Sequence, residues 1–147
     1  MKKISFKKVK GFTLIELMVA VTIVAIISVS ALPIFVDKII RDQVKEGLSL
    51  AESVKEVVYT YTNANEQTFP LDNEEANFPG LTGEFVSSVE IVEGDIIATF
   101  GNRANLTIKN QTLTLTPTTT IGTYISWTCS FSGDVKYAPY ICKNITP

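Results

Sequence analysis

A single acid, Glu16, stands within an apolar run that covers residues 12–36. No other side chain in that run ionises. A carboxylate inside a bilayer costs several kcal/mol unless it is neutralised, so an acid in such a place is usually functional and has a partner. The positive end of a helix macrodipole and an α-amine are the two available partners. The run therefore predicts a site for pairing charges.

The run has the length of a membrane span, and cations lie on one side of it. At about 1.5 Å per residue, a helix over residues 12–36 crosses a hydrocarbon core of about 30 Å with some tilt. The lysines that precede it are Lys2, Lys3, Lys7, Lys8 and Lys10. Lysines flanking a span stay on the cytoplasmic side. We therefore expect the N-terminus inside and everything after residue 36 outside.

Gly11 marks an unusual place for a cleavage site. A secretory signal is cut after its apolar region, whereas Gly11 precedes it. A cut between Gly11 and Phe12 would remove a cationic leader, residues 1–11, and leave the apolar helix on the mature chain. It would also create an α-amine on Phe12, one helical turn from Glu16. Glu16 would then favour its own helix N-terminus or pair with the amine of a neighbouring chain, and both options stay open.

The helical pattern continues beyond the apolar run. Apolar side chains recur there at steps of three and four residues, at Ile40, Val44, Leu48, Ala51, Val54, Val58 and Tyr61. This spacing predicts an amphipathic helix with one buried stripe, so that a single helix would extend over residues 12–61. Pro33 removes a backbone donor and clashes with the preceding turn, which predicts a kink or local melting near residues 30–33.

The remainder of the chain predicts a sheet. Residues 63–93 are rich in Asn, Glu, Gly and Pro, which indicates a long surface connection. Alternating patterns predict strands at 95–101, 104–110, 112–117 and 123–129, with a tight hairpin at Asn110-Gln111. The four strands would form an antiparallel meander, and the helical stripe would cover one face of it. The expected fold class is α+β.

Cys129 and Cys142 are the two cysteines of the chain, and histidine is absent. Two thiolates without an imidazole do not make a zinc site, so we expect no metal. A disulfide formed in an oxidising compartment is the favoured interpretation, with two free buried thiols as the alternative. Closure of a loop of about 14 residues would add about 3 kcal/mol to stability.

Charge and composition disfavour catalysis and broad nucleic-acid binding. The chain of 147 residues has a net charge of −2, but from Phe12 onward eight cations face fifteen acids. Without a histidine or a glycine-rich phosphate loop, we expect neither an enzyme nor a cofactor. A cationic and aromatic tip for stacking DNA is conceivable at Lys136, Tyr137, Tyr140 and Lys143, but ordinary loop composition is the favoured interpretation.

The stretch KGFTLIEL, residues 10–17, resembles the class III signal of type IV pilins and pseudopilins. The short leader and Phe12 resemble the type IVa subclass. The resemblance implies that a prepilin peptidase cuts after Gly11 and methylates the amine of Phe12. It also implies that Glu16 helps to recruit the subunit by neutralising an N-terminal amine. Residues 94–142 are similar to the C-terminal half of type IVa major pilins, in which a D-region would match Cys129–Cys142.

The resemblance implies a structural subunit of a type IV pilus with three parts: a leader (1–11), a transmembrane and filament-core helix (12–36) and a globular head (37–147). The expected partners are further copies in a helical filament, membrane lipid, the prepilin peptidase and the assembly platform. The expected location is the inner membrane before assembly and the extracellular pilus afterwards. The filament would serve adhesion, twitching motility or DNA uptake.

Three alternatives stay open at this stage. The first is a minor pilin or a DNA-binding competence pilin. The second is a pseudopilin of type II secretion, although that group generally lacks a C-terminal disulfide of this kind. The third is a membrane-anchored periplasmic binding module, which would keep its N-terminal lysines.

Overall fold

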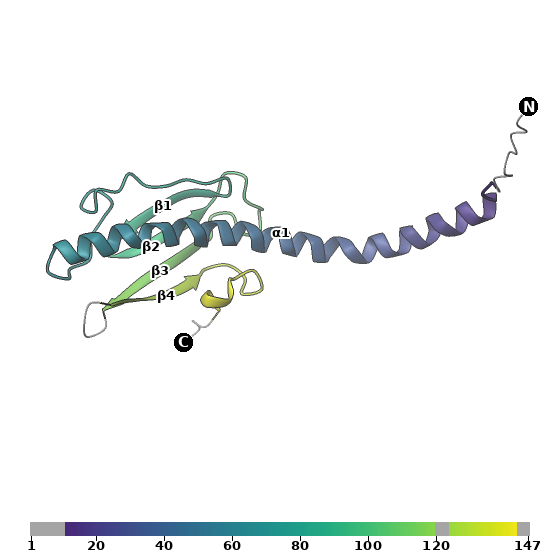
Figure 1. The fold of residues 1–147 in the computed structure, drawn as a ribbon. Helices are drawn as coiled ribbons and strands as arrows, with labels where there is room; N and C mark the ends of the chain where they lie inside the picture. Colours follow the sequence, from purple (N-terminus) through teal and green to yellow (C-terminus); the bar gives the residue numbers. More distant parts are fainter. Residues whose placement is uncertain (1–10, 120–123, 144–147) are drawn as a thin grey trace, which may run out of the picture. The chain divides into compact units, whose positions relative to one another are not determined.

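The computed structural model of the chain describes residues 11–119 and 124–143, except for the side chains of residues 30–32 and 119. It divides into two units, Met1–Val36 and Asp37–Pro147. We call residues 12–36 the stem and residues 37–147 the head. The element order is α1 (Leu14–Ala64), β1 (Val86–Val92), β2 (Asp95–Phe100), β3 (Thr112–Thr119), β4 (Ile125–Phe131) and the 3₁₀ turn η1 (Tyr140–Cys142) (Figure 1).

Helix α1 belongs to both units and closely matches its predicted range. It covers Leu14–Ala64, whereas the periodicity predicts residues 12–61. The helix is continuous through Pro33, which does not test the kink predicted there. Within the described residues, no straight helix meets the length and hydropathy of a membrane span. Leu14–Val29 and Pro33–Ala64 meet them only as a bent pair, by length and composition alone.

The sheet of the head is a four-stranded antiparallel meander in the order β1-β2-β3-β4. This confirms the predicted α+β class with a sheet packed on a long helix. Strands β2, β3 and β4 coincide with three of the predicted runs, with ends that differ by at most two residues. The predicted strand at 104–110 and the hairpin at Asn110-Gln111 are wrong, and β1 lies in a segment predicted to be a connection.

Strand β1 corrects the prediction of an unbroken surface connection over residues 63–93. Its buried residues are Val86, Val89 and Ile91, at steps of three and then two. The register shifts between Val86 and Ser88, which is a β-bulge and explains the interrupted alternation. Because the period-2 signal is broken there, the strand has no clean pattern in the sequence.

Residues 104–110 form turns instead of the predicted strand. The amide of Ala104 donates to the carbonyl of Gly101, and the amide of Ile108 donates to that of Asn105. Ala104 and Ile108, four residues apart, are both buried and fill the core beneath this loop. The predicted Asn110-Gln111 hairpin is also wrong: Asn110 has a left-handed φ of 63° and ends a longer loop that joins β2 to β3.

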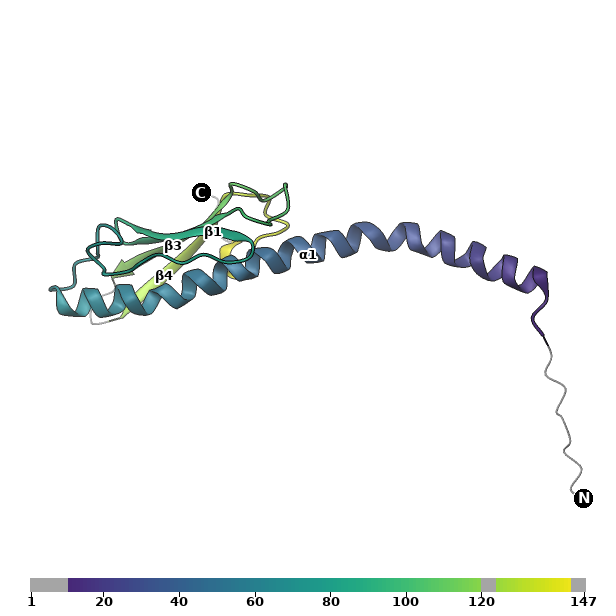
Figure 2. The ribbon, with the colours of Figure 1, turned by 90° about the horizontal axis from the view of Figure 1, so that it is seen from above.

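The core of the head lies between the second part of α1 and one face of the sheet, as two perpendicular views show (Figures 1 and 2). Ile40, Val44, Ala51, Val54 and Val58 form the buried stripe and are at most 2% exposed. The predicted stripe is therefore confirmed for these five residues, with Leu48 partly buried beside them, whereas Tyr61 at its end is only half-buried.

Gly47 permits the close approach of α1 to the sheet. A Cβ atom on Gly47 would lie 2.5 Å from Cζ of Phe100 and 2.7 Å from Cε1. The ring of Phe100 is fully buried and meets Phe131 edge to face, with 6.0 Å between ring centroids. The glycine that weakens the helix by propensity thus makes room for the largest fully buried side chain of the described core.

Candidate assembly site

The stem presents large apolar side chains to its surroundings on every side. Within the described residues of the stem, these side chains are 45% to 84% exposed. They are Phe12, Leu14, Ile15, Leu17, Met18, Val19, Val21, Ile23, Val24, Ile26, Ile27, Val29, Ile34, Phe35 and Val36. A helix that is apolar on all faces needs an apolar environment. The chain by itself does not supply that environment to these side chains.

Glu16 and Thr13 close a reciprocal cap at the start of the stem helix. The amide of Thr13 donates to Oε2 of Glu16 at 3.0 Å, and the hydroxyl of Thr13 donates to the same oxygen at 2.8 Å. The amide of Glu16 in turn donates to Oγ1 of Thr13 at 3.3 Å. This is a capping box, which satisfies backbone donors that a helix N-terminus leaves unpaired. Glu16 therefore binds its own helix in the single chain.

The capping box does not depend on residues 1–11. Its donors and acceptors belong to Thr13 and Glu16 alone, and the amide between Phe12 and Thr13 would survive a cut after Gly11. Gly11 is exposed, and a Cβ atom built on it would meet nothing within 4 Å. An approaching amine would have to compete with the Thr13 donors for the Glu16 carboxylate.

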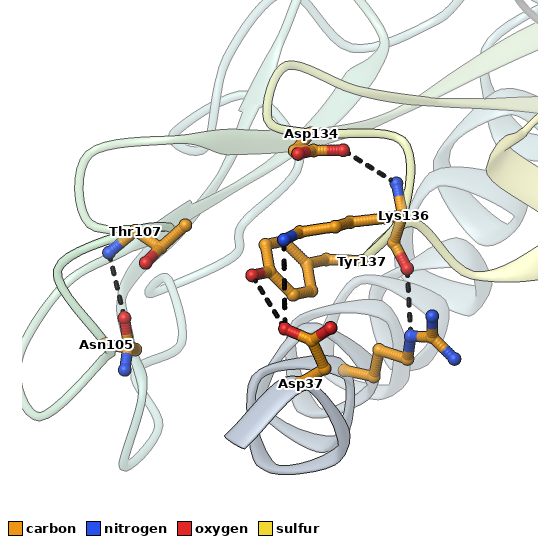
Figure 3. Close-up of polar contacts among 7 residues, drawn as sticks. Asp37, Asn105, Thr107, Asp134, Lys136 and Tyr137 are labelled. Carbon is orange, nitrogen blue, oxygen red and sulfur yellow. Dashed lines mark hydrogen bonds and ion pairs between the residues drawn. The ribbon is translucent and has the colours of Figure 1, made fainter. Parts of the chain in front are cut away.

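The disulfide-bounded segment is fastened to the first turns of α1 in the head (Figure 3). Cys129 and Cys142 are joined in a disulfide, as the sequence predicted. The hydroxyl of Tyr137 donates to Oδ1 of Asp37 at 3.1 Å, and Nζ of Lys136 lies 3.8 Å from the same oxygen. Nε of Arg41 donates to the carbonyl of Lys136 at 2.8 Å.

The same part of α1 also holds the loop between β2 and β3. Oε1 of Gln43, which is 7% exposed, accepts the amide of Asn105 at 2.9 Å. Oδ1 of Asn105 accepts the amide of Thr107 at 2.9 Å and closes a turn (Figure 3). Asp37, Arg41 and Gln43 thus anchor two chain segments that leave the sheet at the same end.

The segment between α1 and β1 covers the open edge of β1. Oδ1 of Asn73 accepts the amide of Ile91 at 2.7 Å, and Leu81 bridges to Val89. Glu75 ties this segment to α1, because its carboxylate accepts the hydroxyl of Tyr61 and, at 2.6 Å, the amide of Leu71. The hydrogen bond from Tyr61, followed by that from Leu71, lowers the pKa of Glu75 below its ordinary value. A covered edge does not pair with strands of other molecules.

The DNA-stacking tip is not assembled as the sequence pattern would require. Tyr137 is 4% exposed and belongs to the core, whereas Tyr140 is 83% exposed. The ammonium of Lys136 lies 4.6 Å from the centroid of the Tyr137 ring. Of the two tyrosine rings of the predicted tip, that of Tyr137 is thus buried and that of Tyr140 is exposed. Within the described part of the chain, no three His, Cys, Asp or Glu side chains are placed to hold a metal ion.

Two family models match the chain. A model described as pilin, a bacterial filament protein, matches residues 41–143, and a model of the prokaryotic N-terminal methylation motif matches residues 6–32. The chain belongs to the type IV pilin family. The methylation motif includes Gly11, Phe12 and Glu16, so this type IV pilin matches a family model both at its N-terminal motif and over most of its head.

Curated relatives resemble the chain over most of its length. Fimbrial protein EcpC of Eikenella corrodens is 36% identical over 141 residues, which cover 92% of this chain and 91% of the relative. Type IV major fimbrial protein FimA of Dichelobacter nodosus is 33% identical, with 92% and 96% covered. Type IV major pilin protein PilE of Neisseria gonorrhoeae is 36% identical, with 82% and 73% covered.

The structure adds residues that the sequence reasoning did not single out for this pilin. Thr13 is the partner of Glu16, and the pattern Thr-x-x-Glu at a helix start is a readable signal for it. Asp37, Arg41 and Gln43 hold the loops of the head across 62 to 100 residues of sequence. No local pattern in the sequence predicts contacts between residues so far apart in the chain.

Proposed function

We propose that the chain is the main structural subunit of a type IV pilus. The observation that carries this proposal is the joining of a stem that is apolar on all faces to a head that has its own core. The pilin match over residues 41–143 and the relatives named as type IV major pilins support it. The stem would lie at the filament axis, and the head would form the filament surface.

The proposed pathway begins with the precursor in the inner membrane. A prepilin peptidase removes residues 1–11 by cutting between Gly11 and Phe12, and the new amine of Phe12 is methylated. The inner-membrane assembly platform then extracts the stem from lipid into the growing filament. The methylation motif at residues 6–32 supports this order of events.

Burial of stems against one another, compared with their exposure to water, holds the assembled filament together, whereas transfer of a stem from lipid gains little of this energy because lipid tails are equally apolar. At about 25 cal/mol per Å², even 1,000 Å² of apolar surface contributes roughly 25 kcal/mol before the costs of ordering. Lipid satisfies the same surface before assembly, so the subunit moves between two apolar environments. Pro33 would let the stem bend on the way, through the kink predicted at residues 30–33.

Glu16 is proposed to exchange its intrachain cap for the N-terminal amine of a neighbouring subunit. The charge pair would set the axial offset between adjacent stems. Inside an apolar filament core, an ionised carboxylate needs a partner of opposite charge. The amine of a cleaved Phe12 is the cation that the chain itself provides.

The variants Glu16→Gln and Glu16→Ala separate these two roles. Glutamine preserves the capping box and removes the charge, whereas alanine removes both. We expect both variants to be cleaved and both to form few or no surface filaments, as counted by electron microscopy and immunoblotting of sheared pili. Normal piliation of Glu16→Gln would show that Glu16 acts only as a helix cap.

A further inference from the structure

The end of the head that anchors the two loops has a charge opposite to that of the rest. We define the collar as residues 37–46, 83–85, 101–111 and 132–143. It carries seven cations and five acids, a balance of +2, whereas the remaining residues of the head carry one cation, Lys55, and nine acids. The cations of the collar are Lys38, Arg41, Lys45, Arg103, Lys109, Lys136 and Lys143.

The antiparallel topology places the parts of the collar at one end of the sheet. The end of β2, the start of β3 and the end of β4 lie there, since consecutive strands run in opposite directions. Figures 1 and 2 show the loop between β2 and β3 and the segment after β4 at the same end. The contacts of Gln43 with Asn105 and of Arg41 with Lys136 hold both segments against α1.

Apolar side chains project from the collar between its cations. Leu106 is 85% exposed and Tyr140 is 83% exposed, and Val135 and Ile141 are also exposed. Tyrosine at the headgroup level, aliphatic tips below it and cations beside phosphates are the composition of proteins that lie on a lipid surface. Outside the collar the head also exposes Leu71 and Tyr124, but this remainder carries nine acids against one cation, so an anionic surface repels it.

We propose that the collar rests on the lipid surface from which the stem emerges while the subunit awaits assembly. Asp37, the first residue of the collar, follows the last residue of the stem in the chain and contacts Tyr137 and Lys136, so the collar contains the residue at which the head continues from the stem. This inference depends on the insertion of the stem in the membrane under the proposed function. The contact keeps the collar at the lipid surface and is released when the stem leaves the bilayer.

Tryptophan reporters test the contact in the full chain. The chain is reconstituted at low density in vesicles of phosphatidylethanolamine and phosphatidylglycerol with brominated acyl chains, which quench tryptophan on contact. All variants carry Trp127→Phe, and their folding is checked by circular dichroism. Tyr140→Trp reports on the collar, Tyr124→Trp is the matched control at 84% exposure, and Ile26→Trp reports on the stem.

We expect Ile26→Trp and Tyr140→Trp to be quenched several-fold more than Tyr124→Trp. If Ile26→Trp is quenched while Tyr140→Trp equals Tyr124→Trp, the stem is inserted and the collar proposal is wrong. If Ile26→Trp is not quenched, the insertion itself is wrong and the collar proposal fails with it. Shielding of Tyr140→Trp that appears only at high protein density would show that a second copy, not lipid, covers the collar.

Charge reversal provides an independent arm of the same test. We expect the pair Lys109→Glu and Lys143→Glu to reduce the quenching of Tyr140→Trp severalfold, because the collar then loses its attraction for anionic headgroups. Lys55→Glu, at the far end of the head, is the control and should leave the quenching unchanged. Equal effects of the two changes would contradict a role for the collar's charge.

Discussion

One helix passes through two regions of this pilin that differ in where its apolar side chains go. In the stem they face outward on all sides, and Phe12 and Leu14 are 84% and 77% exposed. In the head they form one stripe, and Val44 and Val58 are fully buried against the sheet. The backbone geometry is helical in both regions. The comparison shows that a helix can be complete in its hydrogen bonds and still require a partner for its side chains.

The two regions also differ in how their polar groups are satisfied. In the stem, Glu16 and Thr13 satisfy each other within one turn. In the head, Gln43 and Arg41 reach across the chain to distant loops. The head is therefore held together by contacts within one chain, whereas the stem depends on lipid or on other copies.

Removal of the stem should have the largest effect. A chain of residues 37–147 should form no filaments but keep a folded head, because every described residue that is buried in the core belongs to residues 37–147. Circular dichroism and thermal unfolding would measure the fold, and electron microscopy would score filaments. A truncated head that does not unfold cooperatively would contradict the independence of the two regions.

Phe100→Ala in the head and Ile23→Ala in the stem form a matched pair of apolar truncations. Phe100 is fully buried, so its loss should reduce the free energy of unfolding by about 3–5 kcal/mol. Ile23 is 55% exposed, and its replacement should leave the unfolding of the head unchanged. Denaturant titration of the chain in detergent measures both. Comparable losses would mean that the stem contributes to the core of the head.

Gly47→Ala tests how closely the helix and the sheet approach each other. Alanine gains about 1 kcal/mol in helix propensity, but its Cβ atom would overlap the Phe100 ring and cost about 1–3 kcal/mol. We expect net destabilisation, measured by denaturant titration. Ser49→Ala, on the exposed side of the same helix, should change stability by less than about 0.5 kcal/mol. Stabilisation by Gly47→Ala would indicate a looser core.

Glu75→Gln should have the smallest effect, confined to one segment of the head. The pKa of Glu75 is lowered in the folded chain, so its contribution is present at pH above about 4.5 and is lost as the pH falls through the folded value. The segment near Leu71 should therefore loosen in acid, as followed by the NMR signal of the Leu71 amide. Glu75→Gln should remove this dependence on pH, whereas Glu74→Gln should retain it.

The sequence predicted most of what depends on regular spacing. Helix α1, strands β2 and β3 and the fold class follow from periods of 3.6 and 2, and the disulfide follows from the presence of only two cysteines. Strand β1 was missed because its bulge at Val86 and Ser88 breaks the alternation. Residues 104–110 imitate a strand because Ala104 and Ile108 fill the core from within a loop.

The N-terminal motif of the candidate site could be read from the sequence, whereas the residues that anchor the loops of the head could not. Glu16 stands out as one acid in an apolar run; Thr13 was not predicted as its partner, although the pattern Thr-x-x-Glu of a capping box is a readable signal for it. The partners of Asp37 and Gln43 are settled by packing of the whole head, over separations of 100 and 62 residues. Such contacts depend on tertiary structure and leave no local signal.

The intact mass of the subunit in sheared surface filaments tests the central proposal most directly. We predict the mass of a chain that begins at Phe12 and carries one methyl group on its amine, with the Cys129–Cys142 disulfide intact. A filament subunit that begins at Met1, with its five lysines before Gly11 still attached, would contradict release of the stem by cleavage.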